Sequence, residues 1–391
     1  MRMAFIVTHP IQYYVPLYER LNYDRRYKIK VFFTRHDGGE PFYDDQFGRQ
    51  IQWDLPMTSG YEFELVRGQA SLARPFSDLE SVSALVRAVL RWQPDAVHIT
   101  GWHEASHFTA MRTLAMQRVP VLFRGDSHRL DRRKNWLFEI AKYSALRYMY
   151  RFPSAFLYVG SANKAYYREY GVPEDKLVYC PHSVDVMRFQ EYGDAFESKA
   201  VQWRRSLGID DEQFVVLFAG KLVRRKNPIS VIEAVLRCRS KRLVALIVGN
   251  GELELDVRRL ADEFPRAVKL LSFQNQTAMP VVYRLGDCFV LPSDYGETWG
   301  LAVNEALSCG RPVIVSDAAG CAMDLVRSPY GAVYKRGSGD GLMDLIKRFS
   351  ELPDRELQFA RAAAAETARS FDIVVTKDQT IKAFEMVRRC L

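Results

Sequence analysis

One stretch in the carboxyl-terminal half constrains the fold of this chain more than any other. Asp287-Cys-Phe-Val-Leu-Pro292 is a short apolar run that stops at a proline, as a buried strand does. The segment Ser293–Gly300 is rich in turn residues, and Leu301–Ser308 has no helix breaker. Gly310-Arg-Pro312 ends this predicted helix and is followed by Val-Ile-Val-Ser, a second apolar run. The order strand, loop, helix, strand predicts a parallel α/β sheet.

Two carboxylates belong to this unit. Open α/β sheets bind their ligands at the carboxyl ends of the strands, and the amides at a helix start favour an anion there. Glu297 lies in the loop and Glu305 eight residues later, about two helical turns on. The two carboxylates can therefore face one cleft from different heights. The alternative is a pair of exposed glutamates on a surface helix.

The string Leu-Pro-Ser-x-x-x-Glu-x-x-Gly-Leu-x-x-x-Glu-Ala, followed by Cys-Gly-x-Pro-Val-Ile, resembles the signature of glycosyltransferase family 4. These are retaining enzymes that use nucleotide sugars. The resemblance implies an α/β fold of the GT-B class, with two Rossmann-like, doubly wound domains facing each other across a cleft. We expect an acceptor-binding domain at 1–195, a nucleotide-sugar-binding domain at 210–370, and a helix at 371–391 that crosses back to the first domain. The polar residues 190–208 are expected to form a linker.

Length and composition agree with this interpretation. A chain of 391 residues is too long for one core. The net charge of +8 suits an anionic partner, such as a nucleoside diphosphate or an anionic lipid. No basic-aromatic nucleic-acid module occurs, so we expect no nucleic-acid partner. The six cysteines show no paired spacing, and no apolar run approaches the roughly 20 residues of a membrane span. The expected location is the cytoplasm, including the inner face of the cell membrane.

A second loop carries cations. Gly220-Lys-Leu-Val-Arg-Arg-Lys226 follows the apolar run Phe214–Ala219, and cations between a strand and a helix form an anion site. The string resembles the Gly-Arg-Leu…Lys-Gly motif of the family, with Lys221 where arginine is common and Lys226 at the lysine. The resemblance implies that both lysines neutralise the departing diphosphate. Arg225 is expected to be a solvated loop charge.

The resemblance also assigns the other donor contacts. Glu297 is expected to orient hydroxyls of the donor sugar and Glu305 to hold the ribose hydroxyls. The resemblance implies a UDP- or GDP-sugar as co-substrate. No Asp-x-Asp motif stands at a convincing strand end, so we expect no metal or other cofactor. The remaining donor-binding candidates lie in glycine-containing turns and at the central helix: Gly220, Gly249, Gly251, Phe273, Thr298, Trp299, Gly300 and Leu301.

His103 is the catalytic candidate of the amino-terminal half. It follows the predicted strand Pro94–Thr100, at the ligand edge of the sheet. An imidazole at this position can carry the acceptor's proton, and the resemblance implies contact with the donor sugar. The alternative is a loop histidine without a catalytic role.

Two other strand ends give candidates for the acceptor site. Asp126 and His128 follow the predicted strand Val119–Arg124. His9, Gln12 and Tyr13 belong to the string Thr-His-Pro-Ile-Gln-Tyr-Tyr-x-Pro-Leu-Tyr, which resembles bacterial family 4 enzymes that build surface polysaccharides. This resemblance implies a glycan or lipid-linked acceptor. In the alternative interpretation, His9 caps a turn.

Two further segments are open to interpretation. Residues 35–68 are aromatic and lack regular periodicity, and we expect them to form part of an acceptor wall. Residues 131–152 are basic and aromatic, and their charges are not confined to one helical face. They are expected to form either a packed helix with a basic end or a contact with an anionic membrane.

The sequence thus predicts a retaining, metal-independent glycosyltransferase that moves a sugar from a nucleoside diphosphate to an acceptor hydroxyl, in bacterial polysaccharide or glycolipid synthesis. One alternative is a phosphorylase of the same fold that uses sugar 1-phosphate. Another is a non-catalytic subunit that binds a nucleotide sugar.

Overall fold

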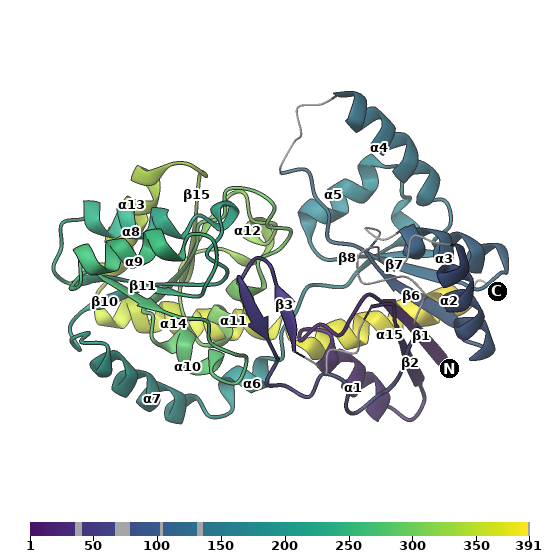
Figure 1. Ribbon diagram of the computed structural model, residues 1–391, viewed down its shortest axis with the longest axis horizontal. Helices are drawn as coiled ribbons and strands as arrows, with labels where there is room; N and C mark the ends of the chain where they lie inside the picture. Colours follow the sequence, from purple (N-terminus) through teal and green to yellow (C-terminus); the bar gives the residue numbers. More distant parts are fainter. Residues whose placement is uncertain (36–40, 67–78, 102–104, 131–135, 390–391) are drawn as a thin grey trace. The chain divides into compact units, whose positions relative to one another are not determined.

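The computed structural model describes residues 1–35, 41–66, 79–101, 105–130 and 136–389, and the chain divides into two units (Figure 1). The first unit comprises Met1–Pro41, Leu55–His182 and Ile373–Leu391. The second unit comprises Phe42–Asp54 and Ser183–Asp372. Each unit is built around its own parallel sheet.

The first unit contains a seven-stranded sheet in the order β5-β2-β1-β6-β7-β8-β9, in which every neighbouring pair is parallel. Its strands are mostly apolar because helices cover both faces of the sheet. They are β1 (Arg2–Val7), β2 (Lys28–Phe33), β5 (Glu62–Leu65), β6 (Ala96–Thr100), β7 (Val121–Arg124), β8 (Ala155–Tyr158) and β9 (Leu177–Tyr179).

Alternate residues of β1 show how the two faces are covered. Ala4 and Ile6 belong to a core cluster with residues of the helices α2 and α3. Phe5 points to the other face, where its ring lies 5.2 Å from Tyr18 and 5.7 Å from Phe384. The helices of this unit are α1 (Val15–Tyr23), α2 (Leu79–Arg91), α3 (Ala105–Met116), α4 (Trp136–Met149), α5 (Ser161–Glu169) and α15 (Ile373–Arg389), with the 3-10 turn η1 (Glu174–Lys176).

The second unit contains a six-stranded parallel sheet in the order β12-β11-β10-β13-β14-β15. Chain order therefore runs outward in both directions from the pair β10 and β13, as in a doubly wound sheet. The strands are β10 (Phe214–Ala219), β11 (Leu243–Val248), β12 (Val268–Leu271), β13 (Cys288–Leu291), β14 (Val313–Ser316) and β15 (Gly331–Tyr334).

One face of this second sheet buries Phe218, Ile247 and Val290 against α8, α9 and α13. On β13, Phe289 instead lies 5.5 Å from the ring of Tyr283 in α10. The helices of the second unit are α6 (Val186–Gln190), α7 (Gly193–Ser206), α8 (Pro228–Arg237), α9 (Glu254–Glu263), α10 (Met279–Arg284), α11 (Leu301–Ser308), α12 (Ala322–Leu325), α13 (Gly339–Ser350) and α14 (Asp354–Arg369), with the 3-10 turn η2 (Arg224–Lys226).

The expected linker at 190–208 is wrong, because most of it is the helix α7. Its polar composition conceals two stabilising contacts. Ala200 is buried, and Arg204 makes a 3.0 Å ion pair with Asp287 at the start of β13. Charged residues in α7 therefore pack the helix against the second unit.

The segment 35–68 also differs from its prediction. It contains the antiparallel hairpin β3 (Phe42–Asp44) and β4 (Arg49–Ile51), followed by β5 at the edge of the first sheet. Residues 42–54 belong to the second unit although the sequence on either side belongs to the first. They contact the predicted donor-binding residues Gly251 and Phe273, and the interpretation of residues 35–68 as part of an acceptor wall stays a prediction.

Two observations bear on membrane topology. None of the helices that the structure describes is both long and apolar enough to span a bilayer. In contrast to a packed helix, α4 buries just Leu146 and Met149 of its fourteen residues. Trp136, Leu137 and Ile140 are 67%, 61% and 55% exposed.

Gly249→Ala should destabilise the second unit, because an added Cβ would lie 1.9 Å from the carbonyl oxygen of Gly220 at a backbone φ of +148°. We expect a cost above about 2 kcal/mol and a Tm lower by about 5–12 °C. The control Gly337→Ala has a φ of +74° but no atom within 4 Å of the new Cβ. Its loss should be about 2–4 °C by thermal unfolding. Equal losses would show that backbone strain, and not the close approach, decides the effect.

Candidate functional site

The loops after β10 and β13 meet at the point where the strand order of the second sheet reverses. Open α/β sheets bind ligands at this position, because the flanking connections run to opposite sides. Backbone contact joins the two loops, since the Asp294 amide donates to the Arg225 carbonyl at 2.9 Å. Asn227 Nδ2 also donates to Asp294 Oδ2 at 2.9 Å.

Lys226 and Glu297 form the central ion pair of this site. Lys226 Nζ lies 2.7 Å from Glu297 Oε2, and Ser293 Oγ donates to the same oxygen at 3.0 Å. Glu297 is 8% exposed. The structure thus brings together two predicted catalytic residues that are 71 positions apart.

The electrostatics keep Glu297 ionised. Burial by itself would raise the pKa of its carboxyl, but the Lys226 ammonium and the Ser293 hydroxyl outweigh burial and hold the pKa below its ordinary value. The result is a fixed carboxylate beside a cation. Such a group accepts hydrogen bonds from hydroxyls without taking up a proton at neutral pH.

Lys221 is the second predicted cation, and the hairpin contacts it. Its Nζ lies 2.8 Å from Asp44 Oδ2 and 3.0 Å from Asp44 Oδ1. The same nitrogen lies 4.8 Å from the centre of the Phe47 ring. Sequence analysis did not identify Asp44, which is the acidic partner of a residue predicted to bind phosphate.

Glu305 lies on α11 and is 2% exposed. Tyr283 Oη donates to its Oε2 at 2.6 Å, and Arg188 Nη2 lies 3.6 Å from its Oε1. Glu305 is therefore a buried, charge-compensated carboxylate and not an exposed helix glutamate. Its partners Tyr283 and Arg188 were also missed, because no local pattern in the sequence indicates such distant contacts.

The other donor candidates also lie in the second unit. Gly220 and Gly249 are adjacent in space, and the backbone amide of Phe273 donates a hydrogen bond to Asn250 Oδ1 at 2.7 Å. Gly300 has a φ of +104° and precedes α11, which begins at Leu301. Trp299 is buried and donates to Asn304 Oδ1 at 2.9 Å, whereas Thr298 is exposed.

The acceptor candidates follow β1 and β7 in the first unit. Thr8 Oγ1 and His9 Nδ1 are 2.8 Å apart, while Gln12 and Tyr13 are half-buried just before α1. His128 Nδ1 accepts a hydrogen bond from the Leu130 amide at 3.1 Å. The catalytic candidate His103 lies outside the described residues.

A buried polar group accompanies these candidates. His182 Nε2 lies 3.8 Å from Asp126 Oδ2, and burial lowers the pKa of His182 despite this carboxylate. Arg124, which is 3% exposed, donates to the carbonyls of Cys180 and Pro181 at 2.7 and 3.0 Å. Sequence analysis took Arg124 as the end of a strand and not as part of a site.

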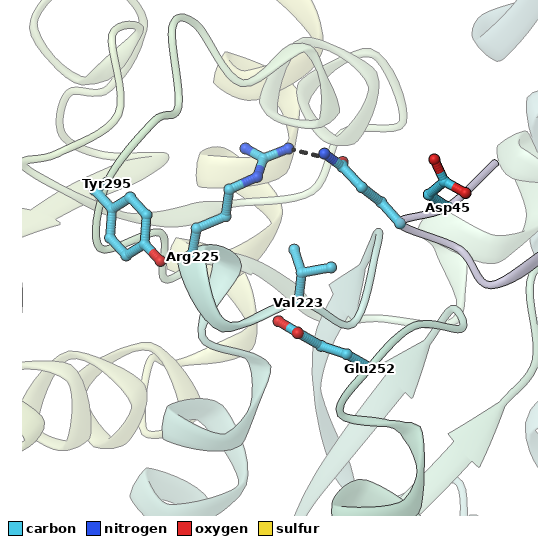
Figure 2. A pocket seen from close by; sticks show the side chains of 6 residues that line it. Asp45, Val223, Arg225, Glu252 and Tyr295 are labelled. Atoms are coloured by element: carbon cyan, nitrogen blue, oxygen red, sulfur yellow. Dashed lines mark hydrogen bonds between the residues drawn. The ribbon is translucent and has the colours of Figure 1, made fainter. Parts of the chain in front are cut away.

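A pocket of about 250 Å³ lies beside the switch-point loops in the second unit (Figure 2). Arg225 Nη2 donates to Gln46 Oε1 at 3.3 Å, and its Nη1 donates to the Gly296 carbonyl at 3.2 Å. Arg225 is thus hydrogen-bonded to protein groups and differs from the solvated charge that was expected. The pocket is lined by Asp45, Gln46, Val223, Arg225, Glu252 and Tyr295.

Two family models match the chain in succession. The model described as "Glycosyl transferase 4-like domain" matches residues 12–182, and the model described as "Glycosyl transferases group 1" matches residues 200–366. Together they cover the whole second sheet and every strand of the first sheet except β1. The resemblance to family 4 that was noted in the sequence is confirmed.

Curated proteins with similar sequences are transferases. The chain is 29% identical over 209 residues to a D-inositol 3-phosphate glycosyltransferase of Pseudarthrobacter chlorophenolicus, covering 51% of this chain and 48% of that protein. It is 25% identical over 254 residues to the N,N'-diacetylbacillosaminyl-diphospho-undecaprenol alpha-1,3-N-acetylgalactosaminyltransferase of Campylobacter jejuni, covering 62% and 63% of the two chains. The match to the first of these proteins spans about half of its length.

Solved structures match over the whole chain. A glycosyltransferase from Rickettsia africae has a TM-score of 0.75 at 13% identity, with 99% of this chain and 98% of that chain covered. HepE of Anabaena in complex with UDP-glucose has a TM-score of 0.70 at 19% identity, with 98% and 99% covered. These likenesses confirm the fold class, GT-B with two Rossmann-like domains.

Glu297→Gln should lower stability more at neutral than at acidic pH. The folded state depresses the pKa of Glu297, so its ionised form contributes stability above the unfolded-state pKa. That contribution is lost as the pH falls through the folded pKa, below about 4.3. The Tm difference between wild type and variant should therefore shrink between neutral pH and the acid range. Glu263→Gln, at an exposed position, controls for removal of a carboxylate. A difference that does not vary with pH would contradict the role of the ion pair.

Proposed function

Because the chain belongs to the glycosyltransferases described by these two family models, we propose that it transfers a sugar from a nucleoside diphosphate to an acceptor hydroxyl with retention of configuration. The observation that carries this proposal is the Lys226–Glu297 pair at the switch point of the second sheet. It places a cation and a fixed carboxylate at the position where this fold binds ligands. A cation there can bind the diphosphate of a donor, and a fixed carboxylate can bind the hydroxyls of its sugar.

Departure of the diphosphate is the main chemical problem. Lys221 and Lys226 supply positive charge in the loop after β10, where charge on the leaving phosphate would develop. These two ammonium groups replace the role that a divalent ion has in other transferases. We therefore propose that the reaction needs no metal ion.

Glu297 is proposed to bind hydroxyls of the donor sugar. Its Oε2 is held by Lys226 and Ser293, so the orientation of the carboxylate is set before the sugar arrives. A carboxylate already paired with an ammonium is a weak nucleophile, which favours a reaction without a covalent intermediate on the enzyme. The bond from the anomeric carbon to the phosphate oxygen breaks, and the acceptor oxygen bonds to the same face. The acceptor's proton passes to the departing phosphate.

Glu305 is proposed to bind the ribose hydroxyls. A carboxylate offers about four acceptor positions, of which Tyr283 uses one. Arg188 Nη2 lies 3.6 Å from the other carboxylate oxygen, Oε1, and Glu305 is 2% exposed. Binding of the ribose would require access to the remaining lone pairs at the start of α11.

The names of the relatives support a lipid-linked or glycan acceptor. The Campylobacter jejuni protein is named for transfer to a diphospho-undecaprenol-linked sugar, and HepE was solved with UDP-glucose. We propose a UDP- or GDP-sugar as donor and a role in bacterial polysaccharide or glycolipid synthesis.

A thermal-shift panel of UDP, GDP, ADP and their sugars, with and without chelator, tests the donor site. One nucleoside diphosphate should raise the Tm by mass action, and chelator should leave the shift unchanged. Lys226→Met should lower the affinity for that nucleoside diphosphate at least about tenfold, because a charge-assisted contact is lost. Arg225→Met, at the preceding residue, is the matched control and should change affinity less than about threefold.

The panel can also reject the proposal. A shift from sugar 1-phosphate with none from any nucleotide would indicate a phosphorylase. Binding of a nucleotide sugar with no turnover on any acceptor would indicate a non-catalytic subunit. Equal losses from Lys226→Met and Arg225→Met would remove Lys226 from the site.

A lipid-linked acceptor also explains the exposed helix α4. Trp136, Leu137, Phe138 and Ile140 expose apolar side chains over one end of the helix, and Arg147 is exposed farther along it. Apolar groups next to cations suit an interface with anionic lipid. We propose that α4 contacts the membrane in which the acceptor is embedded.

Trp136→Glu combined with Ile140→Glu should abolish this contact. Cosedimentation with vesicles containing phosphatidylglycerol should fall at least about fivefold, because two exposed apolar side chains proposed to enter the membrane become charged. The control Phe359→Glu changes an aromatic residue of α14 that is 66% exposed, and it should bind like wild type. Equal binding to pure phosphatidylcholine, or an equal loss in the control, would contradict the proposal.

A further inference from the structure

The hairpin formed by residues 42–54 covers three separate parts of the proposed donor site. Asp44 pairs with Lys221 in the loop after β10. The carbonyl oxygen of Gln46 lies 2.9 Å from the position of an added Cβ at Gly251, in the loop after β11. The ring of Phe47 lies 5.0 Å from that of Phe273, in an edge-on arrangement after β12. Three positions of one hairpin, within four residues, thus contact the proposed cation, the glycine turn and the aromatic residue.

Asp44 contacts Lys221 with two anionic oxygens, as the proposed diphosphate ligand would. Both oxygens of Asp44 lie within 3.0 Å of Lys221 Nζ, as two phosphate oxygens could. The side chains of Lys221 and Asp44 are 24% and 18% exposed. Burial opposes the charge on Asp44, but Lys221 and the amides of Phe47 and Gln46 outweigh burial and lower its pKa. The carboxylate is therefore an anion at neutral pH.

The two ends of the hairpin are attached differently. Near its return strand, Asn275 Nδ2 donates to the Gln52 carbonyl at 2.7 Å, and Thr277 donates its amide to Asp54 at 3.1 Å. Trp53 adds a ring contact with Phe273 at 6.3 Å. These contacts do not involve Lys221. The attachment of Gln52–Asp54 is therefore independent of the Asp44–Lys221 pair.

The pocket in Figure 2 lies beside the turn of this hairpin. Asp45 and Gln46 line it from the hairpin, and Val223 and Arg225 line it from the loop after β10. The hairpin therefore leaves open space next to the cation loop.

We propose that the 42–54 hairpin is a latch on the donor site, in which Asp44 occupies Lys221 until a nucleoside diphosphate displaces it. The proposal rests on the assignment of Lys221 to the diphosphate. In the empty enzyme the latch neutralises the cation and covers the glycine turn and Phe273. Binding of the donor breaks the Asp44–Lys221 pair, and the measured affinity is reduced by the fraction of molecules that are latched. Binding of donor is thereby coupled to a segment whose flanking sequence belongs to the first unit.

The test is calorimetric titration of the full chain with UDP and with GDP. Asp44→Asn removes the charge, while Asn Oδ1 can still accept from the amides of Gln46 and Phe47. We expect affinity to increase about three- to tenfold. Asp45→Asn is the matched control, because it removes the same charge from the next, exposed residue. Its affinity should stay within about twofold of wild type.

A double-variant cycle isolates the pair. Lys221→Met should lower the affinity for the nucleotide. Adding Asp44→Asn to this variant should not raise its affinity, because the cation that Asp44 pairs with is gone. An increase of equal size in the absence of Lys221 would overturn the latch. So would an equal increase from Asp45→Asn.

Failure of the latch and failure of the proposed function give different results. If Lys221→Met and Lys226→Met both weaken binding but Asp44→Asn leaves it unchanged or weaker, the latch is wrong and the donor site stands. In that case Asp44 positions Lys221 for the donor. If neither lysine variant affects either nucleotide, the donor site and the latch are both wrong.

Discussion

The reversal of strand order between β10 and β13 is the constraint on which the chemistry of the second unit depends. From this pair the chain proceeds outward in both directions, so the two following connections cover opposite faces of the sheet. Their loops remain together at the sheet edge, and Lys226 of one loop reaches Glu297 of the other. The first sheet reverses between β1 and β6 in the same way, and acceptor candidates follow β1. Residues with no proximity in sequence thus acquire defined positions from the sheet.

Regular elements were predicted well where apolar runs are continuous and breakers are sharp. The central prediction is reproduced by β13, α11 and β14, and α11 spans the expected Leu301–Ser308. The helix α7 was missed because its stability depends on contacts with α10 and on the ion pair from Arg204 to Asp287. Neither contact can be recognised from the local hydrophobicity of the sequence. A polar segment without Pro, and with Gly only at positions 193 and 208, was therefore mistaken for a linker.

The site shows a similar division. Glu297 and Lys226 were identified from strings that include neighbouring glycines and prolines, and the structure brings them into contact. The partners of these residues were not identified, because each comes from a distant segment. Asp44 and Lys221 are 177 positions apart, and Tyr283 and Glu305 lie on different helices. Local patterns mark the groups that the fold brings together but carry little information about what balances their charge.

The distribution of each unit over the chain has a consequence for the order of folding. Residues 42–54 are synthesised early, but the unit they complete consists mainly of residues 183–372. The helix α15 is synthesised after the second unit, yet it packs in the first unit, where Phe384 lies 5.7 Å from Phe5. The two units therefore cannot be completed one after the other in the order in which the chain is synthesised. A ribosome-bound chain that ends before Ile373 would hold a first sheet with part of one apolar face uncovered, so completion of the first unit waits for synthesis of α15.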